Sequence, residues 1–228
     1  YTCRAYETAT KKCEQKAVVA FTDLLDAVTV TGQLRGEFPT NLLKDMFLEQ
    51  NKLKKTLERI HELFFRYYDE SCKLIGVSKK GYSTWAGLWS QKKHFTLQCD
   101  VIVYLSPKMF REFIHPLIIE ECQYFDRTIW HLDGPLELKH LDDLLGIDEL
   151  DCIQWIPGEG NPDGGEECWV PLYRKIQEKG KKIQIYAPPE KVMHILRRIS
   201  PKGVAITAVC RTNDERIKLT NEIEKEFG

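Results

Sequence analysis

Residues 182–210, KIQIYAPPEKVMHILRRISPKGVAITAVC, decide the fold class of this chain. The apolar run Lys182–Ala187 is typical of a buried strand, and Pro188-Pro189 predicts that a helix begins directly after it. One face of that helix is apolar: Val192, Ile195, Leu196 and Ile199. A second apolar run, Gly203–Cys210, predicts another strand. A strand, a helix and a strand in this order indicate two parallel strands joined by a helical crossover.

The same alternation extends toward both ends of the chain. The other predicted strands are Ala17–Thr22, Tyr82–Trp89, Thr128–Leu132 and Leu150–Ile156. The other predicted helices are residues 41–75, one that Ser106-Pro107 opens, Trp169–Glu178 ending at Gly180, and a last one with the capping pair Thr212 and Glu215. Six strands, each followed by a helix, predict an α/β fold with a parallel sheet covered by helices. An open doubly wound sheet and a (β/α)8 barrel both fit this order, and both place their sites at the carboxyl ends of the strands.

Composition and charge favour an ordinary globular protein that binds a small molecule. The 33 basic and 34 acidic residues leave no basic surplus, so we expect no nucleic-acid partner. No segment reaches the ~18 consecutive apolar residues of a membrane span, and the polar residues 1–15 lack the apolar centre of a signal peptide. Eight cysteines without a CxxC pair indicate reduced thiols. We therefore expect a soluble, cytoplasmic protein with no membrane partner.

His131 and Asp133 form the sharpest candidate site. Both follow the apolar start of a predicted strand, and residues two apart in a strand point to the same side of the sheet. An imidazole and a carboxylate that converge there can work as a catalytic acid–base pair or bind a metal. The alternative is structural, with Asp133 capping the turn at Gly134-Pro135 and His131 hydrogen-bonded to it.

Two further segments supply candidates for chemistry. Cys210 ends the last predicted strand, where its thiol would complete a metal site with His131 and Asp133, or would pack as a small buried side chain. The loop Pro157–Pro162 directly follows a strand, and its glycines, Gly158 and Gly160, allow the backbone to approach a ligand closely. Glu159, between them, is a candidate acid or base.

The remaining candidates are expected to bind the substrate. They lie in or just after predicted strands: Asp23, Trp85, Trp89, Gln154, Trp155, Gly158, Gly160 and Arg211. The tryptophans predict an aromatic wall for an organic molecule, although ordinary core packing explains such residues equally simply.

Several short motifs resemble the uroporphyrinogen decarboxylase superfamily, whose members include decarboxylases and zinc-dependent methyltransferases that use corrinoids. Ser83–Gly87 resembles the aspartate-serine-tryptophan-alanine-glycine segment of that family, and Leu105–Pro107 resembles its next helix start. His131–Pro135, His140–Asp142 and Ile153–Gly158 together resemble an uncharacterised branch of it. The resemblance implies a (β/α)8 TIM-type barrel that lacks its first two strands, with residues 1–228 as a single, partial barrel domain.

The resemblance also implies a function. It favours a methyltransferase that transfers a methyl group to a thiol, or from or to a corrinoid held by a partner protein, with zinc bound by His131, Asp133 and Cys210. Asp133 stands where the methyltransferases carry a cysteine, which puts the activation of a thiol by zinc in question. The alternatives are a decarboxylase of a tetrapyrrole or another polycarboxylate, and a ligand-binding barrel without activity.

Overall fold

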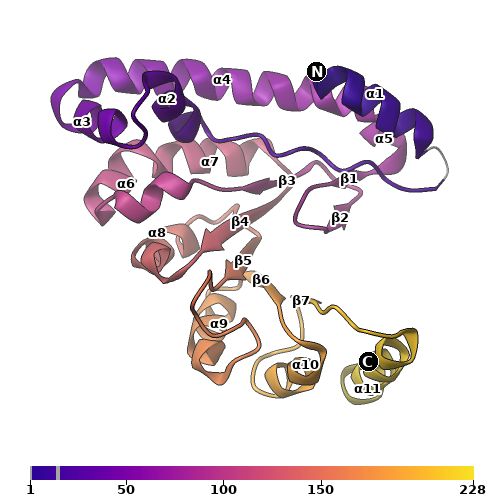
Figure 1. Ribbon diagram of the computed structural model, residues 1–228. Coiled ribbons are helices and arrows are strands. Elements are labelled where there is room, and N and C mark those ends of the chain that lie inside the picture. Colours follow the sequence, from indigo (N-terminus) through magenta and orange to yellow (C-terminus); the bar gives the residue numbers. More distant parts are fainter. Residues whose placement is uncertain (1, 14–15) are drawn as a thin grey trace. The chain divides into compact units, whose positions relative to one another are not determined.

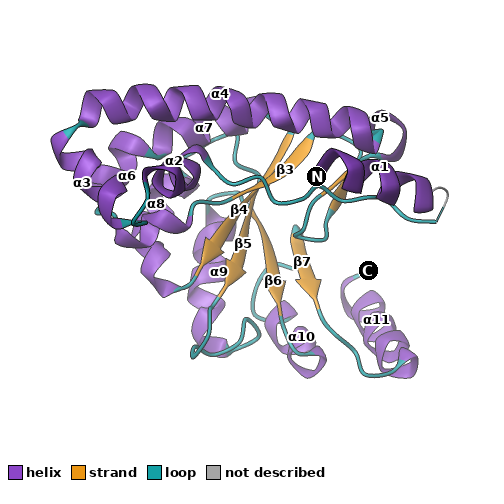
Figure 2. Cartoon of the chain, turned by 45° about the horizontal axis from the view of Figure 1, so that its top comes forward, coloured by secondary structure: helices purple, strands orange, loops and turns teal. Residues whose placement is uncertain are grey.

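The computed structural model describes residues 2–13 and 16–228, and it contains a five-stranded parallel sheet in the order β3-β4-β5-β6-β7 (Figures 1 and 2). These strands are β3 His94–Leu97, β4 Arg127–Asp133, β5 Cys152–Ile156, β6 Lys182–Tyr186 and β7 Val204–Thr207. The predicted α/β class with a parallel sheet is confirmed, and closure of the sheet into a barrel stays a prediction. The chain divides into two compact units, residues 1–128 and 129–228, whereas the sequence suggests one domain.

In the second unit each strand is followed by a helix, as the sequence predicts (Figure 2). The elements between and after the strands are the 3-10 helix η2 Pro135–His140, α8 Leu141–Leu145, η3 Glu167–Trp169, α9 Val170–Glu178, α10 Pro189–Leu196 and α11 Asn213–Phe227. The middle strands form because their apolar side chains are removed from water: Ile153, Ile183 and Ile185 are completely buried.

Three predicted helix ends have the expected caps. The Ser106 hydroxyl accepts a hydrogen bond from the Met109 N–H at the start of α6, and the Thr212 hydroxyl accepts one from the Glu215 N–H at the start of α11. Gly180 follows α9 with a φ of 75°, the left-handed conformation that glycine adopts without strain. Local sequence therefore determines these boundaries.

Helix α11 is packed loosely compared with the other helices of this unit. None of its residues is buried, and its Glu226 forms an ion pair with Arg197 just after α10. A groove of about 590 Å³ separates it from β7 and α10. The lining is mainly apolar and includes Val192, Leu196, Val204, Ile206, Ala208, Cys210, Leu219, Ile223 and Phe227.

The first unit is mostly helical. Its helices are α1 Thr2–Lys12, α2 Ala27–Arg35, α3 Thr40–Leu48, α4 Gln50–Ile75, α5 Val77–Lys80, the 3-10 helix η1 Asp100–Tyr104, α6 Pro107–Phe113 and α7 His115–Tyr124. An aromatic cluster forms the core: the ring of Tyr68, which is completely buried, stacks on Phe21 at 4.7 Å and meets Phe125 edge to face at 4.8 Å. In the polar segment 1–15, Tyr1, Glu14 and Gln15 lie outside the described residues.

Two predicted strands of this unit are wrong. Residues 17–22 are extended but not in a strand: the Phe21 N–H bonds to the Ser83 carbonyl, and Val18 is 41% exposed. Residues 82–89 instead form a hairpin of β1 Tyr82–Ser83 and β2 Trp89–Ser90, because the chain turns at Gly87, whose φ is 76°. The buried strand β3 was not predicted, since its sequence HFTL is short and half polar. The predicted helix 41–75 is divided at Glu49 into α3 and α4.

Buried ionisable groups meet where α4 packs on α7. His61 is 3% exposed, and its ring nitrogens lie 3.4 Å from Glu120 Oε2 and 3.5 Å from Glu121 Oε1. Burial lowers the pKa of His61 to about 4. Burial, with repulsion from Asp26 and Glu120, raises the pKa of Glu121 well above its usual range. At neutral pH His61 is therefore neutral, while burial and the neighbouring carboxylates disfavour the charged form of Glu121.

The replacement His61→Phe is expected to remove a pH dependence from stability. The unfolded chain protonates this histidine near pH 6.5 and the folded chain near pH 4, so its contribution at neutral pH is lost as the pH falls through that interval. The unfolding free energy of the wild type relative to His61→Phe should drop by on the order of 3 kcal/mol from pH 7 to pH 4. Urea unfolding of both chains across this pH range measures the difference between their unfolding free energies. Both chains contain Glu121, so its own titration affects the two profiles alike. Parallel pH profiles would contradict the prediction.

Among the residues that the structure describes, no helix has the length and apolar character to span a bilayer.

Candidate functional site

The centre of the candidate site is a row of three polar side chains across the parallel sheet. The strand register places His131 of β4 beside Gln154 of β5, and Gln154 beside Gln184 of β6. His131 Nδ1 lies 2.5 Å from Gln154 Oε1, and Gln154 Nε2 donates to Gln184 Oε1 at 3.0 Å. Both glutamines are at most 1% exposed, whereas the His131 side chain is 14% exposed. The partly exposed imidazole of His131 is thus hydrogen-bonded to a buried amide, Gln154, which is itself hydrogen-bonded to a second buried amide, Gln184.

Asp133 lies at the end of β4, on the same side of the sheet as His131. Its Oδ2 is 4.0 Å from His131 Nε2, and its side chain is 48% exposed. The strand ends here because Gly134 adopts a φ of 84°, while Glu137 Oε2 accepts a hydrogen bond from the Asp133 N–H at 2.9 Å. The predicted convergence of His131 and Asp133 is therefore observed, with a solvated carboxylate facing a partly exposed ring.

Cys210 does not lie with this pair. It lines the apolar groove of β7, α10 and α11, together with Ile206 and Ala208. The intervening residues Thr207 and Val209 line a different hollow, as the alternation of an extended chain requires. Among residues 2–13 and 16–228, no three His, Cys, Asp or Glu side chains are grouped to hold a metal ion. Catalytic zinc normally has three protein ligands, so this donor set does not fit the predicted zinc site.

The hollow that Thr207 and Val209 line has a volume of about 610 Å³ and lies at the carboxyl ends of β6 and β7. It is lined by Asp163, Tyr186, Ala187, Pro188, Pro189, Glu190, Thr207, Val209, Arg211 and Glu215. Three of these residues are carboxylates and one is a guanidinium, so the hollow carries a net negative charge. Arg211, predicted to bind substrate, is exposed here, and its backbone N–H donates to Glu215 Oε2 at 2.6 Å.

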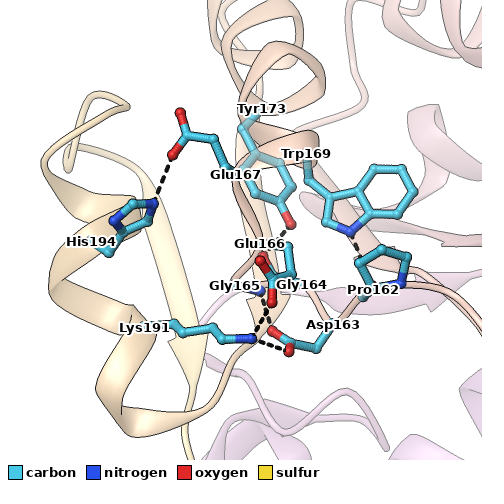
Figure 3. Close-up of polar contacts among 10 residues, drawn as sticks. All are labelled: Pro162, Asp163, Gly164, Gly165, Glu166, Glu167, Trp169, Tyr173, Lys191 and His194. Carbon is cyan, nitrogen blue, oxygen red and sulfur yellow. Dashed lines mark hydrogen bonds and ion pairs between the residues drawn. The ribbon is translucent and has the colours of Figure 1, made fainter.

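Asp163, in the loop after β5, lines one side of this hollow. Hydrogen bonds and ion pairs hold the loop against α10 (Figure 3). Lys191 Nζ donates to Asp163 Oδ2 and to Glu166 Oε1, each at 2.5 Å, and His194 lies 2.7 Å from Glu167. Partial burial alone would raise the pKa of Asp163, but the hydrogen bonds from Lys191 and the Gly165 N–H lower it below its usual range. Asp163 is therefore an anionic anchor of the loop at neutral pH.

Two glycines let the loop approach its neighbours closely, Gly164 beside β6 and Gly165 beside α10. The Tyr173 hydroxyl donates to the Gly164 carbonyl at 2.6 Å, and a Cβ on Gly164 would lie 2.5 Å from the Tyr186 carbonyl oxygen (Figure 3). A Cβ on Gly165 would meet the Lys191 side chain at 2.7 Å. The sequence Gly164-Gly165 is therefore a steric requirement of this wall.

The replacement Gly164→Ala is expected to destabilise the second unit by about 1–3 kcal/mol, because the backbone of β6 cannot yield to the added methyl group. Chemical denaturation followed by circular dichroism measures this loss. Gly146→Ala is the matched control, since its Cβ would come no closer than 3.4 Å to the Asp143 carbonyl and its φ is −78°. Equal stabilities of the two variants would show that the loop is not held as described.

The other predicted residues are distributed over both units. Gly158 and Gly160 have φ values of 79° and 78° and shape the loop around Glu159, which is exposed. Trp155 is completely buried and meets Trp169 at 4.9 Å, on the opposite side of β5 from Gln154.

Three predicted binding residues belong to the first unit. Asp23 accepts hydrogen bonds from Gln98 Nε2 at 2.9 and 2.8 Å. Trp85 is 36% exposed, and Trp89, 57% exposed, donates through Nε1 to the Lys80 carbonyl in the hairpin region. The hairpin accounts for the position of both tryptophans, and their part in substrate binding stays a prediction.

Sequence reasoning missed Gln184. The available signal was a single amide within the apolar strand KIQIYA, which is an unusual place for a polar side chain without a partner. Lys191 and Asp163 were also missed, because their pairing joins a loop to the next helix.

No family model, curated protein or solved structure matches this chain significantly.

Proposed function

We propose that this chain is a small-molecule enzyme in which the His131 imidazole is the catalytic acid–base group, and that its reaction is methyl transfer between a heteroatom acceptor and a corrinoid held by a partner protein. The observation that carries the proposal is the setting of His131: Nδ1 is engaged by a buried amide while Nε2 faces the Asp133 carboxylate at 4.0 Å. The methyl-transfer class comes from the resemblance described above, as does the proposal that the sheet belongs to a (β/α)8 barrel.

The proposed chemistry uses one proton. The methyl group would pass from the corrinoid cobalt to a thiol or hydroxyl acceptor, with the electron pair of the broken cobalt–carbon bond left on the cobalt. The acceptor's proton would pass to His131 Nε2, and the nearby Asp133 carboxylate would stabilise the imidazolium. In the opposite direction the imidazolium returns the proton to the heteroatom that loses the methyl group.

This assignment gives His131 a role that does not depend on zinc. The resemblance implies a zinc site of His131, Asp133 and Cys210, but Cys210 lines another groove and no third donor joins the pair among the described residues. The proposed proton transfer therefore requires only His131 and Asp133.

Decarboxylation of a polycarboxylate receives less support. Such a substrate requires cationic groups, whereas the hollow at the ends of β6 and β7 presents Asp163, Glu190 and Glu215 against the single cation Arg211. The other alternative is a protein that binds a ligand without catalysing a reaction. Such a protein would also contain the hollow, but His131 would have no catalytic role in it.

The test is a methyl-transfer assay on the full chain. A methyl-corrinoid, free or carried by a corrinoid protein, is mixed with a series of thiols and phenols, and demethylation is followed by its visible absorption. Turnover, together with elemental analysis showing much less than one metal per chain, is the expected result. Decarboxylation of uroporphyrinogen in place of methyl transfer would overturn the proposed reaction. Turnover that requires one bound zinc would overturn the metal-independent role of His131.

A further inference from the structure

The hydrogen bonds of the polar row have one direction along the sheet. An amide side chain offers an oxygen that accepts and a nitrogen that donates. Gln154 Nε2 donates to Gln184 Oε1 at 3.0 Å, so the oxygen end of Gln154 is the one that faces His131. This oxygen lies 2.5 Å from His131 Nδ1. Since a carbonyl oxygen has no proton to give, Nδ1 must carry the hydrogen of this bond.

We propose that Gln154 and Gln184 are positioning residues that hold His131 in the Nδ1–H tautomer and so place the lone pair of the neutral ring on Nε2. This inference rests on the proposed function for the use made of Nε2, whereas the tautomer is a property of the folded chain alone. Free histidine prefers the opposite tautomer, so the row works against the intrinsic preference of the ring.

Gln184 enforces the orientation of Gln154 although it does not contact the ring. If the Gln154 amide turned over, its oxygen would face Gln184 Oε1 at about the same short distance, and two acceptors would meet. Both glutamines are completely or almost completely buried, so water does not relieve such a mismatch. The parallel register fixes the order of the row, because His131, Gln154 and Gln184 are consecutive partners in the ladder.

The arrangement matches the way proteins prepare a reacting histidine. A second hydrogen bond, made by the ring nitrogen that does not react, sets both the tautomer and the plane of the imidazole. Here that bond comes from Gln154, a completely buried neighbour on the next strand, and the reacting nitrogen faces Asp133 at the strand end. Gln154, predicted from the sequence to bind substrate, is therefore assigned to the ring and not to the ligand.

The test is a nitrogen-15 spectrum of the full chain with labelled histidine, recorded without substrate, in which the His131 signals are identified by their loss in His131→Ala. The expected result is the Nδ1–H form at and above neutral pH. In Gln154→Met, which keeps the volume but removes the acceptor, the ratio of the Nδ1–H to the Nε2–H form should fall about tenfold. Gln184→Met should shift this ratio in the same direction.

The conservative variant Gln154→Glu is the matched control. As a neutral carboxylic acid it accepts from Nδ1 through one oxygen and donates to Gln184 Oε1 through the other, so the Nδ1–H form should persist. This result would also show that the row tolerates substitution if Gln154→Met failed to fold. An Nε2–H signal in the wild type, or a ratio unchanged by Gln154→Met, would overturn the inference. Because no substrate is present, that outcome differs from a failure of the methyl-transfer assay.

Discussion

Replacement of His131 by alanine is expected to lower turnover by about 10²–10⁴-fold, the usual contribution of a positioned acid–base group. The loss should fall on kcat, because the ring acts on a proton in transit and contributes little to binding. Asp133→Asn should have a smaller effect, since this carboxylate is 48% exposed and stands 4.0 Å from the ring.

The assay for His131→Ala compares steady-state rates with the same methyl donor and acceptor across pH 5–9. The wild-type rate should depend on pH because its acid–base group exchanges a proton during turnover, and this dependence should disappear in the variant. Glu178→Ala, an exposed substitution at the end of α9, is the control for nonspecific effects. A His131→Ala chain that is folded by circular dichroism and retains wild-type turnover would rule out the proposed role.

Replacement of Trp155 by alanine is expected to have the largest effect on stability, a loss of about 3–5 kcal/mol. The side chain is completely buried in β5, and its ring meets Trp169 at 4.9 Å. Its removal leaves a large cavity beside the most buried strands and also forfeits the aromatic contact.

The matched variant for this position is Trp155→Phe. Among the described residues, Trp155 Nε1 makes no hydrogen bond although it is buried, so phenylalanine removes an unsatisfied donor while keeping an aromatic ring. Its cost should therefore stay below about 1.5 kcal/mol. Urea unfolding monitored by circular dichroism compares the two variants. A loss below 1 kcal/mol for Trp155→Ala would show that this side chain is not a core residue.

Much of the second unit was predictable because its signals are local. The runs that became β4, β5, β6 and β7 are apolar and flanked by helix starts and turn residues. In β4, β5 and β6, burial on both faces of a parallel sheet produces that pattern. The caps at Gly180 and Thr212 were predictable for the same reason. The first unit lacked this guidance in part: whether residues 17–22 pair depends on partners distant in the sequence, such as Ser83. The turn at Gly87 that divides residues 82–89 into a hairpin is local, and the apolar run concealed it.

The site was predictable only within one strand. His131 and Asp133 share a face because they are two apart, which requires no knowledge of the neighbouring strands. The row to Gln184 depends on the register between strands, which a single sequence does not contain. Cys210 illustrates the same limit: β7 ends at Thr207, three residues before the predicted end, and the face that Cys210 occupies depends on how β7 is set against β6.

The loose packing of α11 determines where the second unit opens locally at the lowest cost in free energy. Local opening costs least free energy where few side chains are buried, and α11 has none, whereas the loop after β5 is clamped by Lys191 to two carboxylates. Glu215, near the start of α11, lines the hollow at the ends of β6 and β7. Transient detachment of the final helix, and not the lifting of a loop, is therefore the cheapest way to widen that hollow. The rate at which a ligand enters the hollow is then set by the detachment of α11.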